Sequence, residues 1–225
     1  MTTRGNRMRG AMLWAVVIAA VLVSSVSQAT TLRKLSVEDL VAHADTVVVG
    51  KCEKVETVWL ARKIYTIATI RVSESVKGKV DPNNTIKVYM LGGRVRKPMP
   101  VKMHVPGAAK VAKGEEMLLF LKAGGPKKEH HRFVGMTQGR IPIKTDPNTG
   151  RKDICYAEAI KGVRMVDREG RLLAPGVGLE AADEGTLQGF LGRIKQIMAQ
   201  QEAEKAAQQK DLPKDAAGKQ KGGAK

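Results

Sequence analysis

The sequence predicts a small, mainly β domain, a barrel or sandwich of five or more strands, with a short helix before it and an amphipathic helix after it. Between residues 46 and 173, short β-branched or alternating segments recur, separated by turns rich in Gly, Pro, Asn and Asp. No helical segments alternate with these strands, which argues against a parallel α/β sheet. From residue 187 onwards the apolar residues recur every three or four positions, as in a helix.

Length and composition agree with one packed domain. The chain has 225 residues, of which 43% are hydrophobic and only 4% aromatic. That apolar fraction excludes a wholly disordered chain, and the core must consist mainly of Val, Ile, Leu, Met and Ala. Two cysteines are too few for a disulfide-dense scaffold or a cysteine-only zinc site.

The first 29 residues have the pattern of a secretory signal peptide. Three arginines precede an uncharged apolar run over residues 11–26, and Ser27 and Ala29 are the small residues of a cleavage site after Ala29. Sixteen residues of helix reach roughly 24 Å, short of the ~30 Å hydrocarbon core. We therefore expect an exported protein, periplasmic or extracellular, that begins at Thr30. The alternatives are a membrane tether formed by uncleaved residues 11–28 and a buried core helix.

The first elements of the mature chain are a helix and a long strand. Residues 36–43 predict a short helix, because Ser36 can cap it and two acids follow in the first turn. Residues 46–58 begin with three valines and predict a strand, in which Cys52 faces inward. Residues 65–74 alternate in polarity and predict a second strand.

The middle of the chain alternates between strands and long turns. After turn residues 76–84, a strand is expected over 86–90, and the Pro-rich segment 94–113 is expected to be a long loop. The unbroken apolar run 117–121 is typical of a strand buried on both faces. Further strands are expected over the following segments: 132–136, 139–143, 154–156 and the two arms of a hairpin over 163–173.

The C-terminal region changes from helix to tail. Apolar residues form one helical stripe between Leu187 and Met198, and the stripe fades after Gln200. We therefore assign residues 30–200 to a single domain and residues 201–225 to a polar, disordered tail rich in Lys, Gly and Ala.

Several short motifs resemble those of a known group of proteins. Ala44-Asp45 with the valines to Lys51 resembles the opening of OB-type barrels of the netrin-module kind, to which the tissue inhibitors of metalloproteinases belong. The order of the motifs is similar to that of an uncharacterised family of exported bacterial proteins: Tyr65-Thr66, Val76-Lys77-Gly78, Gly92-Gly93, Gly114-Glu115 before Leu118 to Leu121, and Gly135 with Gln138-Gly139. The resemblance covers roughly residues 32–145 and the helix near Phe190. It implies an OB-like β-barrel and export, and it brings no catalytic residues.

One feature of the inhibitors is absent from this sequence. Those proteins bind the zinc ion of their target through an N-terminal cysteine, whereas the expected mature terminus here is Thr30. The resemblance therefore does not extend to inhibition by that route.

The two cysteines predict a disulfide if the chain is exported. A bond between Cys52 and Cys155 would close a loop of about a hundred residues, which in chain-entropy models contributes roughly 4–5 kcal/mol. The alternative is two separate buried thiols. A nucleophilic role for Cys155 has no adjacent base in Asp153-Ile154-Cys155-Tyr156 to support it.

The sequence contains no recognisable catalytic, metal or cofactor motif. His130 and His131 are adjacent, so on a strand they point to opposite faces, and we expect them in a solvated basic loop rather than at a metal. His43 and His104 are isolated. Neither a GxSxG nucleophile elbow nor a GxxxxGK[ST] phosphate loop occurs.

Positive charge is the remaining functional signal. The formal net charge is +17, and between Arg94 and Arg132 ten Lys or Arg face three acids. Such a patch attracts polyanions in a salt-dependent way. The alternative interpretation is a solvated basic face without a specific partner. The residues that we expect to contact an anionic partner are Arg94, Arg96, Lys97, Lys102, Lys127 and Lys128.

Three functions compete on this reading. The first is a non-enzymatic exported module whose basic loops contact an anionic envelope component, such as a glycan or a lipid head group, or a protein partner. The second is a nucleic-acid-binding protein of the same fold, which applies if residues 1–29 are not an export signal. The third is an enzyme of unrecognised type, which a cluster of a histidine with a carboxylate would favour.

Overall fold

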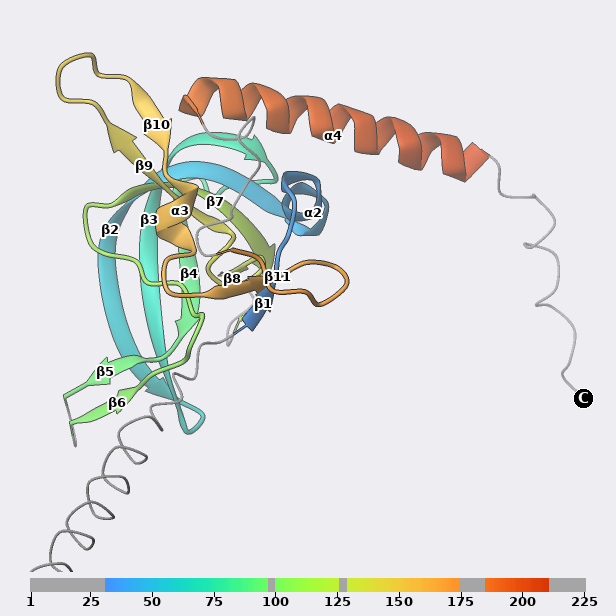
Figure 1. Cartoon of the computed structure of the whole chain (residues 1–225). Coiled ribbons are helices and arrows are strands. Elements are labelled where there is room, and N and C mark those ends of the chain that lie inside the picture. The colour runs from blue at the N-terminus through green and yellow to red at the C-terminus, as the bar shows by residue number, and fades with distance from the viewer. Residues whose placement is uncertain (1–30, 97–99, 126–128, 175–184, 211–225) are drawn as a thin grey trace, which may run out of the picture.

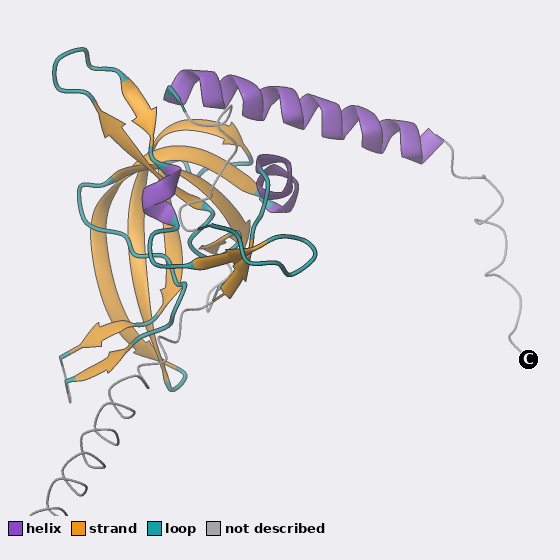
Figure 2. Ribbon diagram, viewed as in Figure 1, coloured by secondary structure: helices purple, strands orange, loops and turns teal. Residues whose placement is uncertain are grey.

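Two long antiparallel strands dominate the computed structural model, which describes residues 31–96, 100–125, 129–174 and 185–210 (Figures 1 and 2). β2 (Thr46–Leu60) and β3 (Lys63–Lys77) pair along their whole length. Their register shifts three times between Val47 and Lys54, and such bulges bend a strand and increase its twist. The predicted strands at 46–58 and 65–74 are confirmed, and both extend to the tip of one hairpin.

Five shorter strands complete a seven-stranded sheet. Its order is β10-β9-β7-β2-β3-β4-β8, and β8 also pairs with β7. All neighbours are antiparallel except β4 and β8, which are parallel. The prediction of a mainly β protein is confirmed. The bounds of the five strands are as follows: β4 (Thr85–Leu91), β7 (Glu116–Ala123), β8 (His130–Phe133), β9 (Arg140–Thr145) and β10 (Lys152–Ile154).

β7 is buried on both faces, as its unbroken apolar run predicts. Leu118 and Phe120 belong to a core between the sheet and the helices, together with residues of α2 (Val37–His43) and α4 (Leu187–Lys210). Leu119 and Leu121 belong to a second core on the opposite face of β7, which contains residues of β2, β3 and β4. Alternate side chains of one strand thus join two cores.

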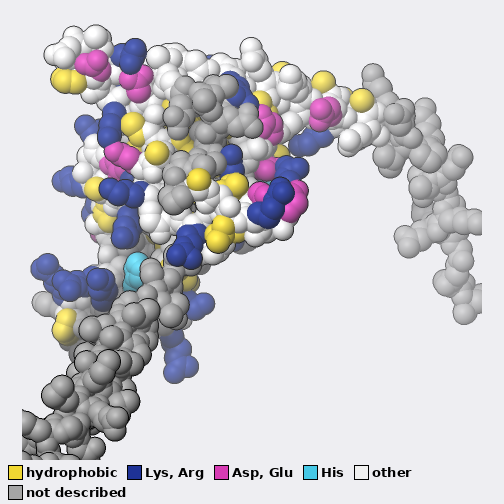
Figure 3. Space-filling model, viewed as in Figure 1, with side chains coloured by type: hydrophobic (Ala, Val, Ile, Leu, Met, Phe, Trp, Pro, Cys, Tyr) yellow, Lys and Arg dark blue, Asp and Glu magenta, His cyan; other side chains and the backbone are white. Residues whose placement is uncertain are grey.

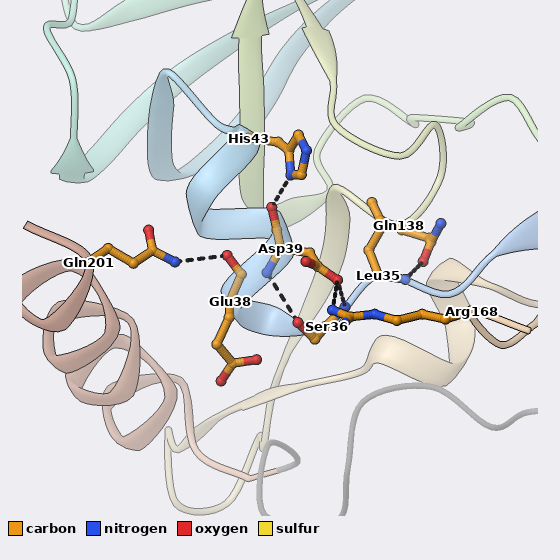
Figure 4. A network of polar contacts seen from close by, with 8 residues as sticks. All are labelled: Leu35, Ser36, Glu38, Asp39, His43, Gln138, Arg168 and Gln201. Atoms are coloured by element: carbon orange, nitrogen blue, oxygen red, sulfur yellow. Dashed lines mark hydrogen bonds and ion pairs between the residues drawn. The ribbon is translucent and has the colours of Figure 1, made fainter. Parts of the chain in front are cut away.

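The N-terminal helix forms where the sequence predicts it, and its start is fixed by a capping box. The Asp39 backbone N–H donates to Ser36 Oγ at 3.1 Å, and the Ser36 N–H donates to the Asp39 carboxylate at 3.2 Å (Figure 4). Gln201 Nε2 donates to the Glu38 carbonyl at 3.0 Å, which ties α4 to α2. These contacts lie on the helical side of the first core.

The C-terminal helix is longer than expected. α4 runs to Lys210, so residues 201–210, which we assigned to a disordered tail, are helical. The physical reason is composition: Ala, Glu, Gln and Lys are strong helix formers even where no apolar stripe remains. The predicted signal peptide at residues 1–29 and the tail residues 211–225 lie outside the described residues. No helix in the described part of the chain has both the length and the apolar character needed to cross a membrane.

Several short elements differ from the expectation. The segment expected to be a loop over 94–113 contains a two-stranded ribbon, β5 (Gly93–Val95) with β6 (Val101–Met103). β1 (Thr31–Arg33) pairs with β11 (Arg164–Val166), the first arm of the predicted hairpin. The strand expected over 154–156 ends at Ile154, because Cys155 is the N-cap residue of the short helix α3 (Tyr156–Ala159).

The expected disulfide is absent. Cys52 is buried in the second core and its thiol donates to the Lys54 carbonyl at 3.5 Å, whereas Cys155 lies at the start of α3, beside residues of the first core. The two side chains are therefore associated with different cores. Burial raises the pKa of the Cys52 thiol.

Candidate functional site

The basic ribbon β5–β6 brings two of the predicted contact residues together. Arg94 lies directly opposite Lys102 in the antiparallel register, so both side chains leave the same face. Arg96 follows β5 and is exposed. Like charges at facing positions destabilise a strand pair, which makes this arrangement costly for folding alone. In the space-filling view, Lys and Arg side chains gather over the end of the molecule where β5 and β6 lie (Figure 3).

Glycine fixes the ribbon against the long hairpin. Gly93 has φ +138°, and a Cβ there would lie 2.6 Å from Thr66 Oγ1 and 2.7 Å from Thr57 Cγ2. The Gly92 N–H donates to the Ile64 carbonyl at 2.8 Å, and Thr66 Oγ1 donates to the Gly92 carbonyl at 2.7 Å. Only a residue without a side chain allows so close an approach, so the sequence Gly92-Gly93 determines where the ribbon lies.

A hollow of about 570 Å³ lies beneath this ribbon, and we call it the ribbon hollow. Arg94, Lys102, His104 and Lys110 supply all of its ionisable lining groups, and residues of β4 contribute apolar lining. Among the described residues, the ionisable side chains that line the ribbon hollow are therefore three cations and one imidazole, with no carboxylate.

A second hollow of about 470 Å³ lies beside the first, and we call it the apolar hollow. Its lining is mostly apolar, its charged groups are Lys122 and Arg132, and His43 and Tyr89 also line it. Lys122 faces Arg132 across β7 and β8, a second cross-strand pair of like charges. Within the described part of the chain, no carboxylate forms an ion pair with either of them.

The two hollows share a wall. It consists of apolar residues from the end of β4 and from the segment after β6: Met90, Leu91, Val105, Ala108 and Ala109. Each hollow thus combines a cross-strand cation pair with apolar lining. Guanidinium and ammonium groups bind carboxylate and phosphate oxygens, while the shared wall suits an alkyl or aromatic group.

The other predicted contact residues contribute less or lie elsewhere. Lys97, Lys127 and Lys128 are outside the described residues. Lys122 and Arg132 belong to the basic segment that the sequence identifies, but alternation within one strand does not reveal that they face each other. Their pairing depends on the register between β7 and β8, which only the folded chain supplies.

The histidines do not lie in a solvated loop as expected. His130 and His131 are in β8, and His130 is 3% exposed with its ring 4.1 Å from that of Tyr89. Burial lowers the pKa of His131, whose Nδ1 is buried and has no hydrogen-bond partner in the described residues. His130 Nε2 lies 3.9 Å from the carboxylate of its exposed neighbour Glu129. Among the described residues no three His, Cys, Asp or Glu side chains are placed to hold a metal ion.

An aromatic cluster on β3, β4 and β8 was missed by the sequence reasoning. Tyr65 and Tyr89 pack edge to face with ring centroids 5.7 Å apart, and Tyr89 also contacts His130. Trp59, Tyr89 and His130 line a smaller hollow of about 280 Å³ with Lys87. Because Tyr89 and His130 are 7% and 3% exposed, they do not offer the open faces on which nucleic-acid bases stack.

A further cavity of about 520 Å³ is also lined by the segment after β6. Arg140 lines it and is ion-paired with Glu115, and burial lowers the pKa of the guanidinium. Arg140 Nε is buried and has no hydrogen-bond partner among the described groups. Glu158 also lines this cavity, so its charge is mixed, unlike that of the two hollows.

No protein-family model matches the chain, and no curated protein matches it in sequence. The function must therefore be argued from the geometry.

Proposed function

We propose that this protein is an exported, non-catalytic binding module that holds an anionic amphiphile in the ribbon hollow and the apolar hollow. One observation carries the proposal: each hollow has a cross-strand pair of cations, Arg94 with Lys102 and Lys122 with Arg132, next to an apolar wall. A head group with carboxylate or phosphate oxygens neutralises such a pair, and its apolar part is buried against Met90, Leu91 and Val105.

The volumes suit a ligand of that size. Small-molecule sites typically enclose about 300–1,000 Å³, are mostly apolar and have a few placed polar groups. Both hollows lie in that range, at about 470 and 570 Å³. Unpartnered like charges at facing positions lower the stability of the free protein, and a bound anion would relieve that repulsion.

We infer that the framework is an OB-type barrel. The pairing of β7 with β2, β2 with β3, β3 with β4, β4 with β8 and β8 with β7 supports this inference. Barrels of this type carry ligands on a strand face and on the connecting loops, and both hollows use the connection between β4 and β7.

A direct test uses dodecyl phosphate, below the concentration at which it forms micelles, in a calorimetric titration. We expect saturable binding that falls steeply with added salt, and weaker binding of inorganic phosphate and of uncharged dodecyl maltoside. The variant Lys122→Gln/Arg132→Gln should lose at least about tenfold in affinity, because it removes two charge-assisted hydrogen-bond donors.

The control is a pair of exposed cations, one Lys and one Arg, that line neither hollow. Lys79→Gln/Arg164→Gln removes the same formal charge and should leave the affinity unchanged. Equal affinities in the two double variants, or binding that does not depend on salt, would contradict the proposal. Tighter binding of a single-stranded oligonucleotide that is lost with Lys122 and Arg132 would favour the nucleic-acid alternative.

Export has its own test. The intact mass of the protein recovered from its native host should correspond to a chain that begins at Thr30. A full-length chain would instead favour the tether or a cytoplasmic role, without bearing on the affinity of the hollows.

A further inference from the structure

The tip of the β2–β3 hairpin exposes two large apolar side chains at one end of the molecule. Trp59 is 53% and Leu60 39% exposed, and they are consecutive at the end of β2. Soluble proteins expose single apolar residues freely, but a neighbouring Trp and Leu at a protruding tip need a reason. Trp is the residue that most favours the boundary between water and the acyl chains of a bilayer.

Cations surround this apolar tip. Arg62 and Lys63 follow it directly, and both are exposed. Between residues 55 and 70 the sequence has a single acid, Glu56, whose carboxylate is already 2.7 Å from Lys54 Nζ. In the part of the chain that the structure describes, neither Arg62 nor Lys63 has an ion-pair partner. The apolar tip therefore lies within uncompensated positive charge.

The basic ribbon adds to this charge from beside the hairpin. The close contacts of Gly93 with Thr57 and Thr66 hold β5 next to β2 and β3, a few residues from the tip. Figures 1 and 3 show that β5, β6 and the hairpin tip lie at the same end, where Lys and Arg side chains gather. Arg94 and Arg96 thus belong to the same end as Arg62 and Lys63.

The turn itself is held in an unfavourable conformation. Ala61 and Arg62 both have positive φ, 48° and 63°, in a two-residue turn that normally uses Asn or Gly at these positions. Each such residue costs energy that a structural role alone does not require, since Asn-Gly would form the same turn. This conformation places Arg62 in the turn, at the tip of the hairpin.

We propose that residues 59–63 are a docking element for the surface of an anionic bilayer. Trp59 and Leu60 enter the interface, where their apolar area is buried, and Arg62 and Lys63 remain among the anionic head groups. The combination of apolar and cationic side chains in five residues selects a lipid surface, because it matches both the acyl and the charged layers. The docking element itself, residues 59–63, lines neither the ribbon hollow nor the apolar hollow and does not depend on their ligand.

The experiment measures binding of the chain that begins at Thr30, which lacks the apolar residues 11–26, to phosphatidylcholine vesicles with and without phosphatidylglycerol. Trp59 is the only tryptophan of this chain. We expect binding only to vesicles that contain phosphatidylglycerol, with a blue shift of Trp59 emission and quenching by brominated acyl chains. Trp59→Ala, measured by sedimentation with the vesicles, should weaken binding at least tenfold, and Arg62→Gln and Lys63→Gln by about fivefold each.

Leu172→Ala is the matched control, because Leu172 is 64% exposed in a different hairpin and should not affect binding. Vesicle binding that is unchanged in Trp59→Ala, or binding without quenching of Trp59, would overturn the proposal. So would a tip that binds single-stranded DNA and not vesicles. Binding of dodecyl phosphate by Trp59→Ala should be unaltered, so failure of this inference and failure of the proposed function give different results.

Discussion

Gln138 holds Leu35 through a buried side-chain amide. The Leu35 backbone N–H donates to Gln138 Oε1 at 2.9 Å (Figure 4). Gln138 Nε2 donates to the Arg33 carbonyl at 3.0 Å. One buried amide thus satisfies a donor and an acceptor of the segment that joins β1 to α2, more than one hundred residues away in sequence. The Tyr156 hydroxyl lies 3.5 Å from the same oxygen.

Replacing this amide should destabilise the fold. In Gln138→Leu the Leu35 N–H and the Arg33 carbonyl lose their partners, which costs about 1–3 kcal/mol. Chemical denaturation measures the loss. The exposed Gln196→Leu on α4 is the control and should change the free energy of unfolding little. An equal change in both variants would show that the buried hydrogen bonds are not responsible.

The cysteines should behave as two separate thiols. We expect both to react with a thiol reagent in denaturant without prior reduction. In the folded protein Cys155, which is partly exposed, should react first, because Cys52 is buried and burial raises the pKa of its thiol, so that less thiolate is present. The Cys155→Ser variant isolates the reaction of Cys52. A chain that reacts only after reduction would contradict the structure and restore the disulfide.

His131 should make the fold sensitive to mild acid. Burial lowers the pKa of His131 below the value of about 6.5 expected in the unfolded chain. As the pH falls below that unfolded value, the unfolded state binds the proton first, so the free energy of unfolding decreases until the pH passes the lowered folded pKa. The stability due to neutral His131 is therefore complete above about pH 7 and decreases below about pH 6.5.

The variant His131→Gln should reduce this dependence. The free energy of unfolding, measured by chemical denaturation at several values between pH 7 and pH 5, should change less with pH in the variant. The difference should be up to about 1.4 kcal/mol per pH unit. His104→Gln, at an exposed position, should retain the slope of the parent protein. If the free energy of unfolding depends on pH equally in the parent and in His131→Gln, groups other than His131 are responsible for that dependence.

Local sequence patterns predict where the strands of this protein form, but they do not predict which strands pair. The valines of β2, the alternation in β3 and the apolar run of β7 are local signals, and each strand forms where they place it. The ribbon β5–β6 has no such signal, because its two strands are three residues each and are separated by prolines. Gly92-Gly93 is the feature that could have indicated it.

The candidate site illustrates the same limit. Sequence reasoning selected Arg94 and Lys102 as part of a basic segment, but their facing register, and that of Lys122 with Arg132, follows from strand pairing. The pairing of Cys52 with Cys155 failed for a related reason: inward-facing positions do not tell which of two cores a side chain joins. Trp59 became a candidate only when its exposure was known.

The hairpin turn allows folding and docking to be separated. Ala61→Asn and Arg62→Gly place residues that tolerate positive φ in a turn where both central positions require it. We expect Ala61→Asn/Arg62→Gly to raise the free energy of unfolding by about 1 kcal/mol, as measured by chemical denaturation. In vesicle binding, Ala61→Asn alone keeps every charge and should bind like the parent, whereas the double variant lacks Arg62 and should bind more weakly. A double variant that is less stable than the parent would show that the turn is not strained. One that is more stable and binds vesicles as tightly as the parent would show that Arg62 has no part in docking.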